Sequence, residues 1–511
     1  MEHYDTRGTP EAFARSVSAF HLLTATLSGP AAGEWTHGEL EEHLQEAGRA
    51  LMRQLLQDHL DLRAIREEEH LAARPGLRVT GPDGRPRPWR EKEHERWLST
   101  VFGHVRVRRI AHRGPGVSNV HPSDVLLSLP AGRHSAGLRR LAVVEAVRGS
   151  FDQALAAVER QCGPVVGKRR LEELVTEAAA DVDGFYWASI PLPCSREMPL
   201  VIQADGKGVV MRPEALREAT RRKAAQAAAA GRRGRLAPGE KPNRKRMATI
   251  ACVFDTRPAS RRPHDVIGPP EGRSANRTRR PRPKAENKWL TASLVKTPEE
   301  VIAEAFDQAQ ARDRHHLRDW IVLVDGARHQ LDVIQAEAAH RGVTIHVLID
   351  FVHVTEYVWA AAHAFHKPGS REAEAFTADR LTAILAGHAA RVADELLALA
   401  DQAHLTASPR EAVITCHRYL TGHLDQLHYD TALEAGWPIA TGAIEGACRH
   451  LIADRLDITG ARWGLAGAEA VLKLRAVTSN GDLDTYWTFH IAREHERLYP
   501  NPDQATFRLT A

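Results

Sequence analysis

The stretch DWIVLVDGARHQLDVIQAEAAHRGVTIHVLIDFVHV, residues 319–354, decides how the middle of this chain is expected to fold. It begins with an apolar strand, 319–327, and continues with an amphipathic segment, 329–342, which Gly342 closes as a helix. A further apolar run, 343–354, predicts a second strand. A strand, a helix and a strand in this order predict two parallel strands joined by a helical crossover.

Three more strands are expected before this segment. They are PLVIQADGKGVVM (199–211), whose apolar strand is expected to end at Asp205, RMATIACVFDTR (246–257) and KWLTASL (288–294). An amphipathic helix with Pro298 at its start fills 298–313. Three strands followed by helix, strand, helix and strand is the order of an RNase-H-like fold, in which parallel strands extend an antiparallel meander. The expected fold class is therefore α/β, with a mixed five-stranded sheet.

The rest of the chain divides by its pattern into helical and strand-rich parts. The expected parts are a helical N-terminal region (1–95), a small β element (96–135), a helix-turn-helix-like region (136–195), the first part of the α/β core (196–355) with a basic insertion (211–287), an all-α insertion (356–436), the second part of the core (437–480) and a C-terminal tail (481–511) whose elements the pattern does not assign.

Composition is that of a folded protein. The chain has 511 residues, of which 43% are hydrophobic and 26% charged, which excludes a wholly disordered or collagen-like chain. Its five cysteines are too few for a disulfide framework and include no C-x-x-C pair, so a structural zinc site is not expected. The N-terminal residues lack the pattern of a signal peptide, and no apolar run is long enough to span a membrane. We expect a soluble, cytoplasmic protein without a membrane partner.

The net charge of +4 hides a strong segregation. Residues 211–287 carry 21 Lys and Arg against 7 Asp and Glu, a net of +14, so the rest of the chain carries −10. We expect this segment to bind DNA phosphates, with a partly disordered, solvated insertion as the alternative. Its candidate DNA-binding residues are Arg221, Arg222, Lys223, Arg244, Lys245, Arg246, Arg279 and Arg280, and similar clusters lie at 232–235 and 277–282.

A second candidate for DNA binding lies further upstream. Ser150 and Gln153 form a capping-box pattern that starts a helix, and a Gly-containing break at 163–167 ends it. The next helix begins with Lys168, Arg169 and Arg170. This arrangement is typical of a helix-turn-helix reader, although any helical hairpin with a solvated basic end would look the same.

Acidic residues follow the apolar part of two expected central strands. Asp205 and Asp325 lie on the expected first and fourth strands, which are neighbours in this topology. Two carboxylates at one sheet edge repel each other unless cations lie between them, and Mg²⁺ prefers such oxygen ligands. Glu445, between two glycines, is the candidate third ligand, and Asp350 after the fifth strand competes with Asp325. The alternatives are ordinary Asp-Gly turns and a helical ion pair of Glu445 with Arg449.

Five segments in this order resemble one family. They are VIQADGKGVVM, IVLVDGARHQ, LIDFVHVTEYVW, TGAIEGACRHLIADRL and GARWGLAGAEAVLKLRA, and roughly residues 95–490 resemble DDE transposases of bacterial insertion sequences, most closely the ISKra group and its ISL-type relatives. The resemblance implies cleavage and strand transfer of double-stranded DNA with two Mg²⁺ or Mn²⁺ ions. It also implies at least a homodimer in a prokaryotic cytoplasm, associated with the nucleoid.

The resemblance assigns roles to single residues. By position, the catalytic and metal-binding triad falls on Asp205, Asp325 and Glu445. A C-or-D-x-x-H motif of related transposases matches Asp350 and His353, for which we expect an accessory role in shaping the site or contacting DNA ends. Asp350 also remains an alternative to Asp325, and a structural role remains open for His353. Arg462 and Trp463 are candidates for binding phosphate or a flipped base, although packing is the favoured role for Trp463.

Two other functions fit the same residues. One is a structure-selective nuclease or resolvase on the same fold, which would cleave DNA without strand transfer. The other is a DNA-binding regulator with an inactive core, against which the three acidic positions argue.

Overall fold

The computed structural model describes residues 9–191, 194–229, 244–268 and 279–500. The chain forms two compact units. Unit 1 consists of Met1–Trp187 together with Leu483–Ala511, and unit 2 consists of Ala188–Asp482.

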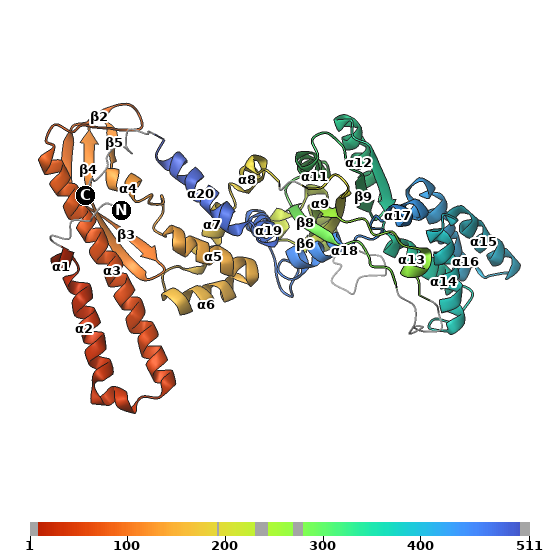
Figure 1. Ribbon diagram of the computed structural model, residues 1–511, viewed down its shortest axis with the longest axis horizontal. Coiled ribbons are helices and arrows are strands. Elements are labelled where there is room, and N and C mark those ends of the chain that lie inside the picture. Colours follow the sequence, from red (N-terminus) through yellow and green to blue (C-terminus); the bar gives the residue numbers. More distant parts are fainter. Residues whose placement is uncertain (1–8, 192–193, 230–243, 269–278, 501–511) are drawn as a thin grey trace. The chain divides into compact units, whose positions relative to one another are not determined.

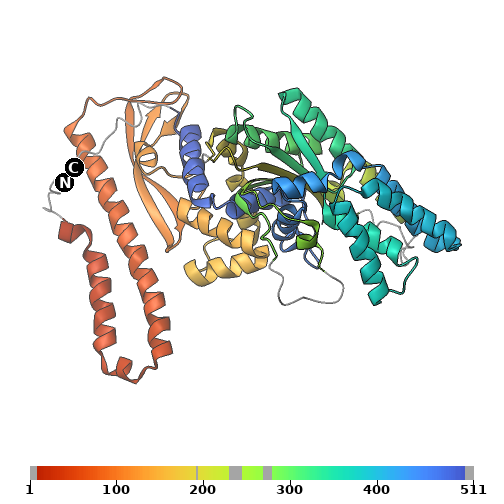
Figure 2. The same ribbon diagram turned by 45° about the vertical axis from the view of Figure 1, so that its right-hand side comes forward.

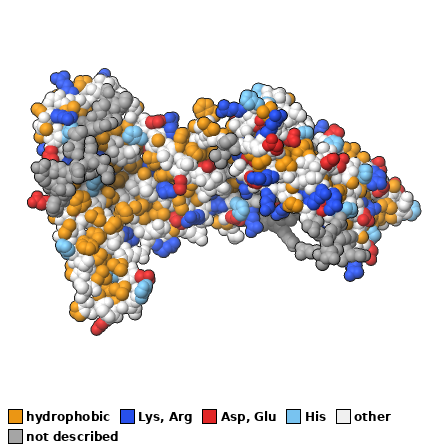
Figure 3. Space-filling view, viewed as in Figure 1, with side chains coloured by type: hydrophobic (Ala, Val, Ile, Leu, Met, Phe, Trp, Pro, Cys, Tyr) orange, Lys and Arg blue, Asp and Glu red, His pale blue; other side chains and the backbone are white. Residues whose placement is uncertain are grey.

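Unit 1 begins with an antiparallel pair of helices (Figures 1 and 2). After α1 (Thr9–Ala12), α2 (Ala14–Ser28) leads through the 3₁₀ turn η1 (Pro30–Glu34) into α3 (His37–Ala73). Thr36 and Glu39 form a capping box that starts α3. Large apolar side chains cover much of the outer surface of this hairpin (Figure 3), and the exposed ones are Val17, Phe20, Leu22, Leu44, Met52 and Ile65.

A β-hairpin packs against α3. Its strands are β3 (Trp89–Thr100) and β4 (Gly103–Gly114), which pair antiparallel, and β5 (Val117–Val120) extends them beyond β4. The positive φ of Gly103, +118°, allows the tight turn between the two strands. Strand structure starts earlier than expected, because β1 (Val79–Thr80) and β2 (Pro86–Arg87) precede the hairpin.

Helices complete unit 1. The bounds are α4 (Pro122–Leu126), α5 (Ala136–Arg148), α6 (Phe151–Cys162), α7 (Lys168–Ala178), α8 (Val182–Ala188, which ends at the unit boundary) and the C-terminal α20 (Leu483–Leu498). The expected capping box at Ser150 is confirmed, and Gly163, with φ of +78°, ends α6. The described part of the tail that the sequence left unassigned contains the helix α20, and it belongs with the N-terminal part of the chain.

Unit 2 is built on a five-stranded mixed sheet. Its strands are β6 (Leu200–Val210), β7 (Lys245–Thr256), β8 (Ala285–Ser293), β9 (Trp320–Val324) and β10 (Ile345–Ile349). They lie in the order β10-β9-β6-β7-β8. β6, β7 and β8 are antiparallel, whereas β9 is parallel to both β6 and β10. The expected pairing of the first and fourth strands is confirmed.

Two strand ends differ from expectation. β6 does not end at Asp205, because β7 continues to pair with it as far as Val210. Gly206 is thus part of a strand and not of a turn. The fifth strand ends at Ile349 instead of residue 354, because the Asp350 carboxylate accepts a hydrogen bond from the Val352 amide and starts a helix.

Helices cover the sheet and form the insertion. The bounds are η2 (Pro213–Ala215), α9 (Glu218–Ala229), α10 (Pro263–Val266), α11 (Pro298–Arg312), α12 (Arg328–Arg341), α13 (Phe351–Ala362), α14 (Arg371–Leu385), α15 (Ala389–Gln402), α16 (Ala407–Thr421), η3 (Leu424–Gln426), α17 (Tyr429–Ala435), α18 (Gly442–Ala447), the π-helical turn η4 (Cys448–Ala453) and α19 (Leu465–Ser479). α11 packs on β6, β7 and β8, and α18 packs on β6 and β7. Residues 442–453 are not one continuous α-helix, because α18 passes into η4 at Cys448.

Ionic groups are buried at the end of the sheet away from Asp205. The Asp255 carboxylate is 1% exposed and lies 2.6 Å from the Arg318 guanidinium and 3.2 Å from that of Arg312. Loss of one partner from such a group is costly, so this cluster fixes the ends of β6 and β7.

All five cysteines are free. Within the described ranges, none of the helices combines the length and apolar character needed to cross a membrane.

A candidate carboxylate site

Asp205 and Asp325 lie level with each other at one edge of the sheet. The last parallel pair between β6 and β9 joins Gln203 to Leu323. Each Asp is two residues further along its strand direction, so the register places the two at equivalent positions. Ile349 pairs with Val324, which places Asp350 at the same edge. This placement follows from the sheet topology that the sequence predicted.

Asp205 is partly exposed and makes local contacts. Its Oδ1 accepts a hydrogen bond from the Gly206 amide at 2.6 Å. The Cys448 thiol donates to its Oδ2 at 3.1 Å. Burial and the neighbouring Asp205 carboxylate raise the pKa of Cys448, so the thiol remains a donor. Cys448 therefore orients the first carboxylate.

The loop after β9 holds Asp325 at the edge. Oδ1 of Asp325 accepts a hydrogen bond from the Ala327 amide at 3.1 Å, and the Tyr419 hydroxyl donates to its backbone carbonyl at 3.3 Å. Gly326 has a φ of +92°, and a Cβ there would lie 3.0 Å from Ile349 Cδ1 and 3.4 Å from both the Tyr419 hydroxyl and His423. Glycine is required here by both conformation and space. The insertion helix α16, which carries Tyr419, thus supports the second carboxylate.

Gln203 fixes the helix that carries Glu445. Its side chain is 1% exposed. Its Oε1 accepts from the Ile444 amide at 2.9 Å, and its Nε2 donates to the Ala440 carbonyl at 3.3 Å. These two bonds hold the start of α18 on β6, on the same side of the strand as Asp205. Glu445 itself is exposed. Arg449 lies 3.8 Å from Asp454 and does not pair with Glu445.

Asp350 differs from the other acidic residues because it is fully buried. Its exposed fraction is 0%, and its Oδ1 accepts hydrogen bonds from the amides of both Val352 and Thr441. Its Oδ2 also lies 2.7 Å from the Thr441 hydroxyl and 3.2 Å from Nδ1 of His353. The same Thr441 hydroxyl lies 3.3 Å from Oε1 of Glu445. Asp350 therefore connects the end of β10 with the segment that precedes α18.

The His353 imidazole lies close to several negative charges at this edge. Partial burial lowers the pKa of its imidazole, but the hydrogen bond to Asp350 and the nearby charges of Asp350, Asp325 and Glu356 outweigh burial and raise it. The structural role left open for His353 is thus supported by a hydrogen bond.

The acidic residues match a magnesium ion in chemistry but do not form a closed cage. Carboxylate oxygens are the ligands that Mg²⁺ prefers, and it commonly uses one or two of them together with water and substrate phosphates. Within the described parts of the chain, no three His, Cys, Asp or Glu side chains are grouped so that they could hold a metal. The donor set therefore fits the metal only as a partial site that substrate oxygens would complete.

The three cations at the start of α7 are paired with carboxylates. The pairs are Lys168 with Asp152 at 2.7 Å, Arg169 with Glu173 at 3.3 Å and Arg170 with Glu177 at 2.8 Å. Arg169 remains highly exposed, with 94% of its side chain accessible. Helix, break and helix occur as predicted, while the local negative charges reduce the field that would attract DNA.

The basic insertion contains both exposed and structural cations. Arg221, Arg222 and Lys223 are exposed on α9, where Arg222 forms an ion pair with Glu218. Arg246 instead donates to the backbone carbonyls of Leu294 and Ala215, and Lys245 pairs with Asp457 at 3.0 Å. Arg244, Arg279 and Arg280 lie beside segments that are outside the described residues, as are the predicted cluster at 232–235 and Arg277.

Trp463 is packed inside unit 2. Only 7% of it is exposed, its Nε1 donates to the Leu456 carbonyl at 3.0 Å, and the Arg455 guanidinium lies 4.7 Å from its ring centroid. These contacts favour the packing role over stacking on a base. Arg462 is exposed and remains a candidate for phosphate binding.

Sequence reasoning missed three positioning residues: Gln203, Thr441 and Cys448. Gln203 had a visible signal, since it is a lone amide in the apolar run LVIQA. Thr441 and Cys448 act through contacts across long sequence separations, which no local pattern reports.

A comparison of the chain with models of known protein families finds no match, and neither does a comparison with curated proteins.

Proposed function

We propose that this protein is a DNA transposase of the DDE type, with an RNase-H-like core that cleaves DNA ends and joins them to a target. The observation that carries the proposal is the level placement of Asp205 and Asp325 on two paired parallel strands. The strand order β10-β9-β6-β7-β8 and the Gln203 anchor of the Glu445 helix support it. Double-stranded DNA is the proposed partner, with at least two copies of the chain acting together in the cytoplasm.

The chain's own residues position the reaction. Asp205, Asp325 and Glu445 would hold the divalent ions. When bound, Mg²⁺ would supply positive charge that stabilises the attacking and leaving oxygens of an in-line displacement. Cys448 orients Asp205, and Tyr419 with Gly326 fixes the loop of Asp325. The protein thus contributes geometry and charge more than proton transfer.

Asp350 is proposed as a positioning residue and not as a metal ligand. A ligating carboxylate needs open lone pairs, whereas both oxygens of Asp350 already accept hydrogen bonds in a site without exposure. Asp325 is partly exposed and has fewer contacts. The assignment of Asp325 as the second carboxylate therefore has support beyond strand order.

DNA cleavage with purified full-length protein tests the proposal. The substrate is a plasmid that carries the inverted repeats flanking the gene, incubated with and without Mg²⁺. We expect Mg²⁺-dependent cuts at the repeat ends followed by joining to target DNA, and loss of both in Asp205→Ala, Asp325→Ala and Glu445→Ala. Cleavage without joining would favour a nuclease or resolvase. Binding without cleavage would favour a DNA-binding regulator.

A further inference from the structure

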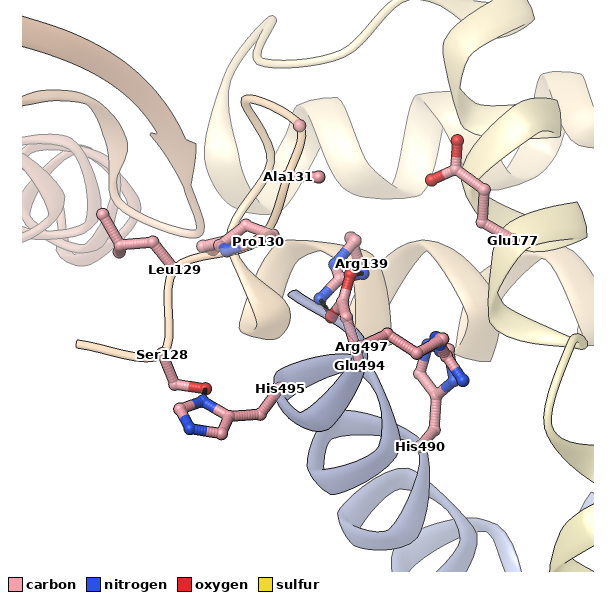
Figure 4. Close-up of polar contacts among 12 residues, drawn as sticks. Ser128, Leu129, Pro130, Ala131, Arg139, Glu177, His490, Glu494, His495 and Arg497 are labelled. Carbon is pink, nitrogen blue, oxygen red and sulfur yellow. Dashed lines mark hydrogen bonds and ion pairs between the residues drawn. The ribbon is translucent and has the colours of Figure 1, made fainter. Parts of the chain in front are cut away.

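Unit 1 contains a cavity of about 470 Å³ that lies outside the carboxylate site. Its walls come from the segment after α4 and from α5, α7 and α20. Figure 4 shows Glu494 of α20 pointing toward Arg139 of α5, and His490 and Arg497 of the same helix both contact Asp181. The volume is within the range of small-molecule sites, roughly 300–1,000 Å³.

His490 lines this cavity and carries a buried ring nitrogen without a partner among the described residues. The residue is 3% exposed, and its Nδ1 lies 2.7 Å from Oδ2 of Asp181. Because a carboxylate can only accept, the proton is on Nδ1, and Nε2 carries a lone pair. Nε2 has no hydrogen-bond partner among the described residues. Burial lowers the pKa of His490 despite Asp181, so the ring remains neutral near pH 7.

Arg139 also lines the cavity. It is 5% exposed, and its two terminal nitrogens bind the two carboxylate oxygens of Glu494, one of them at 2.8 Å. This leaves the Nε–H group, which is buried and finds no partner within the described part of the chain. An unpaired buried donor and an unpaired buried acceptor are each costly, so a ligand that satisfies both is favoured.

The charges of the walls balance. The three arginines that line the cavity each face a carboxylate: Arg139 with Glu494, Arg170 with Glu177 and Arg497 with Asp181. Balanced walls do not favour a free phosphate or a carboxylate. Pro130, Leu174 and Leu498 add apolar surface to the lining. The ligand should therefore be neutral and flat, with a donor and an acceptor on one edge.

We propose that this cavity binds a nucleobase, presented either by a free nucleoside or by an unpaired base of a DNA strand. Every base has a polar edge that combines donors and acceptors with apolar faces. His490 Nε2 accepts from an amino or imino group of the base, and Arg139 Nε donates to a carbonyl or ring nitrogen. The proposal is independent of the chemistry in unit 2, because all lining residues belong to unit 1.

Binding to the full-length protein tests the inference. The probes are adenosine, guanosine, cytidine and thymidine, a short DNA duplex with one bulged base, and the same duplex fully paired. Inorganic phosphate serves as a probe that should not compete. Binding of a nucleoside identifies a free ligand, whereas tighter binding of the bulged duplex alone identifies an unpaired base of DNA.

Variants that fill the cavity connect binding to this place. Ala180 and Ala131 line it and are exposed, so Ala180→Phe and Ala131→Trp should leave the buried ion pairs intact. Ala72→Phe, at an exposed position of α3 away from the cavity, is the control. We expect each filling variant to weaken binding about tenfold or more, the size of one lost base contact.

The inference is overturned if no nucleoside binds and the bulged duplex binds no better than the paired one. It is also overturned if binding occurs but neither filling variant weakens it. Circular dichroism of each variant shows whether the fold is retained, and two independent variants guard against the misfolding of one.

Discussion

At the scale of single residues, burial separates carboxylates that look alike in the sequence. Asp325 and Asp350 both follow apolar strands of the same sheet, and the sequence left their roles open. Asp350 is 0% exposed and surrounded by donors, while Asp325 is partly exposed at the edge beside Asp205. The first arrangement stabilises a fold, and the second leaves oxygens available for a ligand.

This contrast predicts different effects of the same substitution. Asp325→Asn should abolish Mg²⁺-dependent cleavage and leave the unfolding temperature almost unchanged, because few contacts are lost. Asp350→Asn should destabilise unit 2 by roughly 1–3 kcal/mol, because it weakens buried hydrogen bonds to a charged acceptor. Cleavage assays and thermal unfolding measure the two effects. The reverse pattern, with a stable but inactive Asp350→Asn, would make Asp350 the second ligand.

At the scale of elements, the Gln203 bridge is expected to control the position of α18. Gln203→Leu removes both bonds and leaves the Ile444 amide and the Ala440 carbonyl buried without partners. We expect a loss of roughly 1–3 kcal/mol in stability and faster hydrogen exchange at α18. Gln335→Leu, at an exposed position of α12, is the matched control and should change neither. Unchanged exchange at α18 in Gln203→Leu would show that other contacts hold this helix.

Acid should loosen the attachment of α20 within unit 1. Burial raises the pKa of Asp181, but its bonds to Arg497 and His490 outweigh burial and lower it below the ordinary value of 3.8. A lowered pKa in the folded state gives stability that is present above pH about 4 and is lost as the pH falls through the folded pKa.

Asp181→Asn should therefore destabilise unit 1 by roughly 1–3 kcal/mol at pH 6 and by less at pH 3, measured by urea unfolding. Asp152→Asn changes an exposed ion pair with Lys168 and should have almost no effect at either pH. Equal destabilisation by Asp181→Asn at both pH values would contradict the ionic explanation.

Elements with a strong local pattern were predictable, and their ends were less so. The strands at 199–211, 246–257, 288–294 and 319–327 occur because apolar runs between turn residues specify them. β6 continues past Asp205 because pairing with β7, a non-local contact, decides its end. Residues 351–354 are apolar enough for a strand, yet the Asp350 cap makes them helical. In the site, the acidic edge followed from topology, whereas Gln203, Thr441 and Cys448 required the folded chain.

At the scale of the whole molecule, the chain forms two units, and in the sequence the second unit separates the two segments of the first. No sequence pattern indicated that α20 would pack with the N-terminal region, because its contacts join residues more than 300 positions apart, such as Asp181 and Arg497. The charge of the chain is distributed just as unevenly, with a basic insertion in unit 2.

This distribution predicts a salt-dependent affinity for DNA. Replacing Arg221, Arg222 and Lys223 with Gln should weaken binding and reduce the slope of log K against log salt by up to about 3, since each phosphate contact contributes about 0.9. Replacing Lys168, Arg169 and Arg170, all three of which are paired with carboxylates, should reduce the slope less than replacing the α9 cations, of which Arg222 is paired with Glu218. Fluorescence anisotropy over a range of salt concentrations measures both. An unchanged slope in the α9 variant would remove α9 from the DNA surface.

The most direct test of the proposed site is a change of metal preference. A cysteine thiolate is a soft ligand that binds Mg²⁺ poorly and accepts softer divalent ions more readily. In Asp205→Cys and Asp325→Cys, we expect DNA cleavage to be lost with Mg²⁺ and partly restored with Mn²⁺, whereas Asp350→Cys should show no such rescue. Cleavage by Asp205→Cys and Asp325→Cys that is equal to wild type with Mg²⁺, or rescue by Mn²⁺ in Asp350→Cys alone, would contradict the assignment of Asp205 and Asp325 as metal ligands.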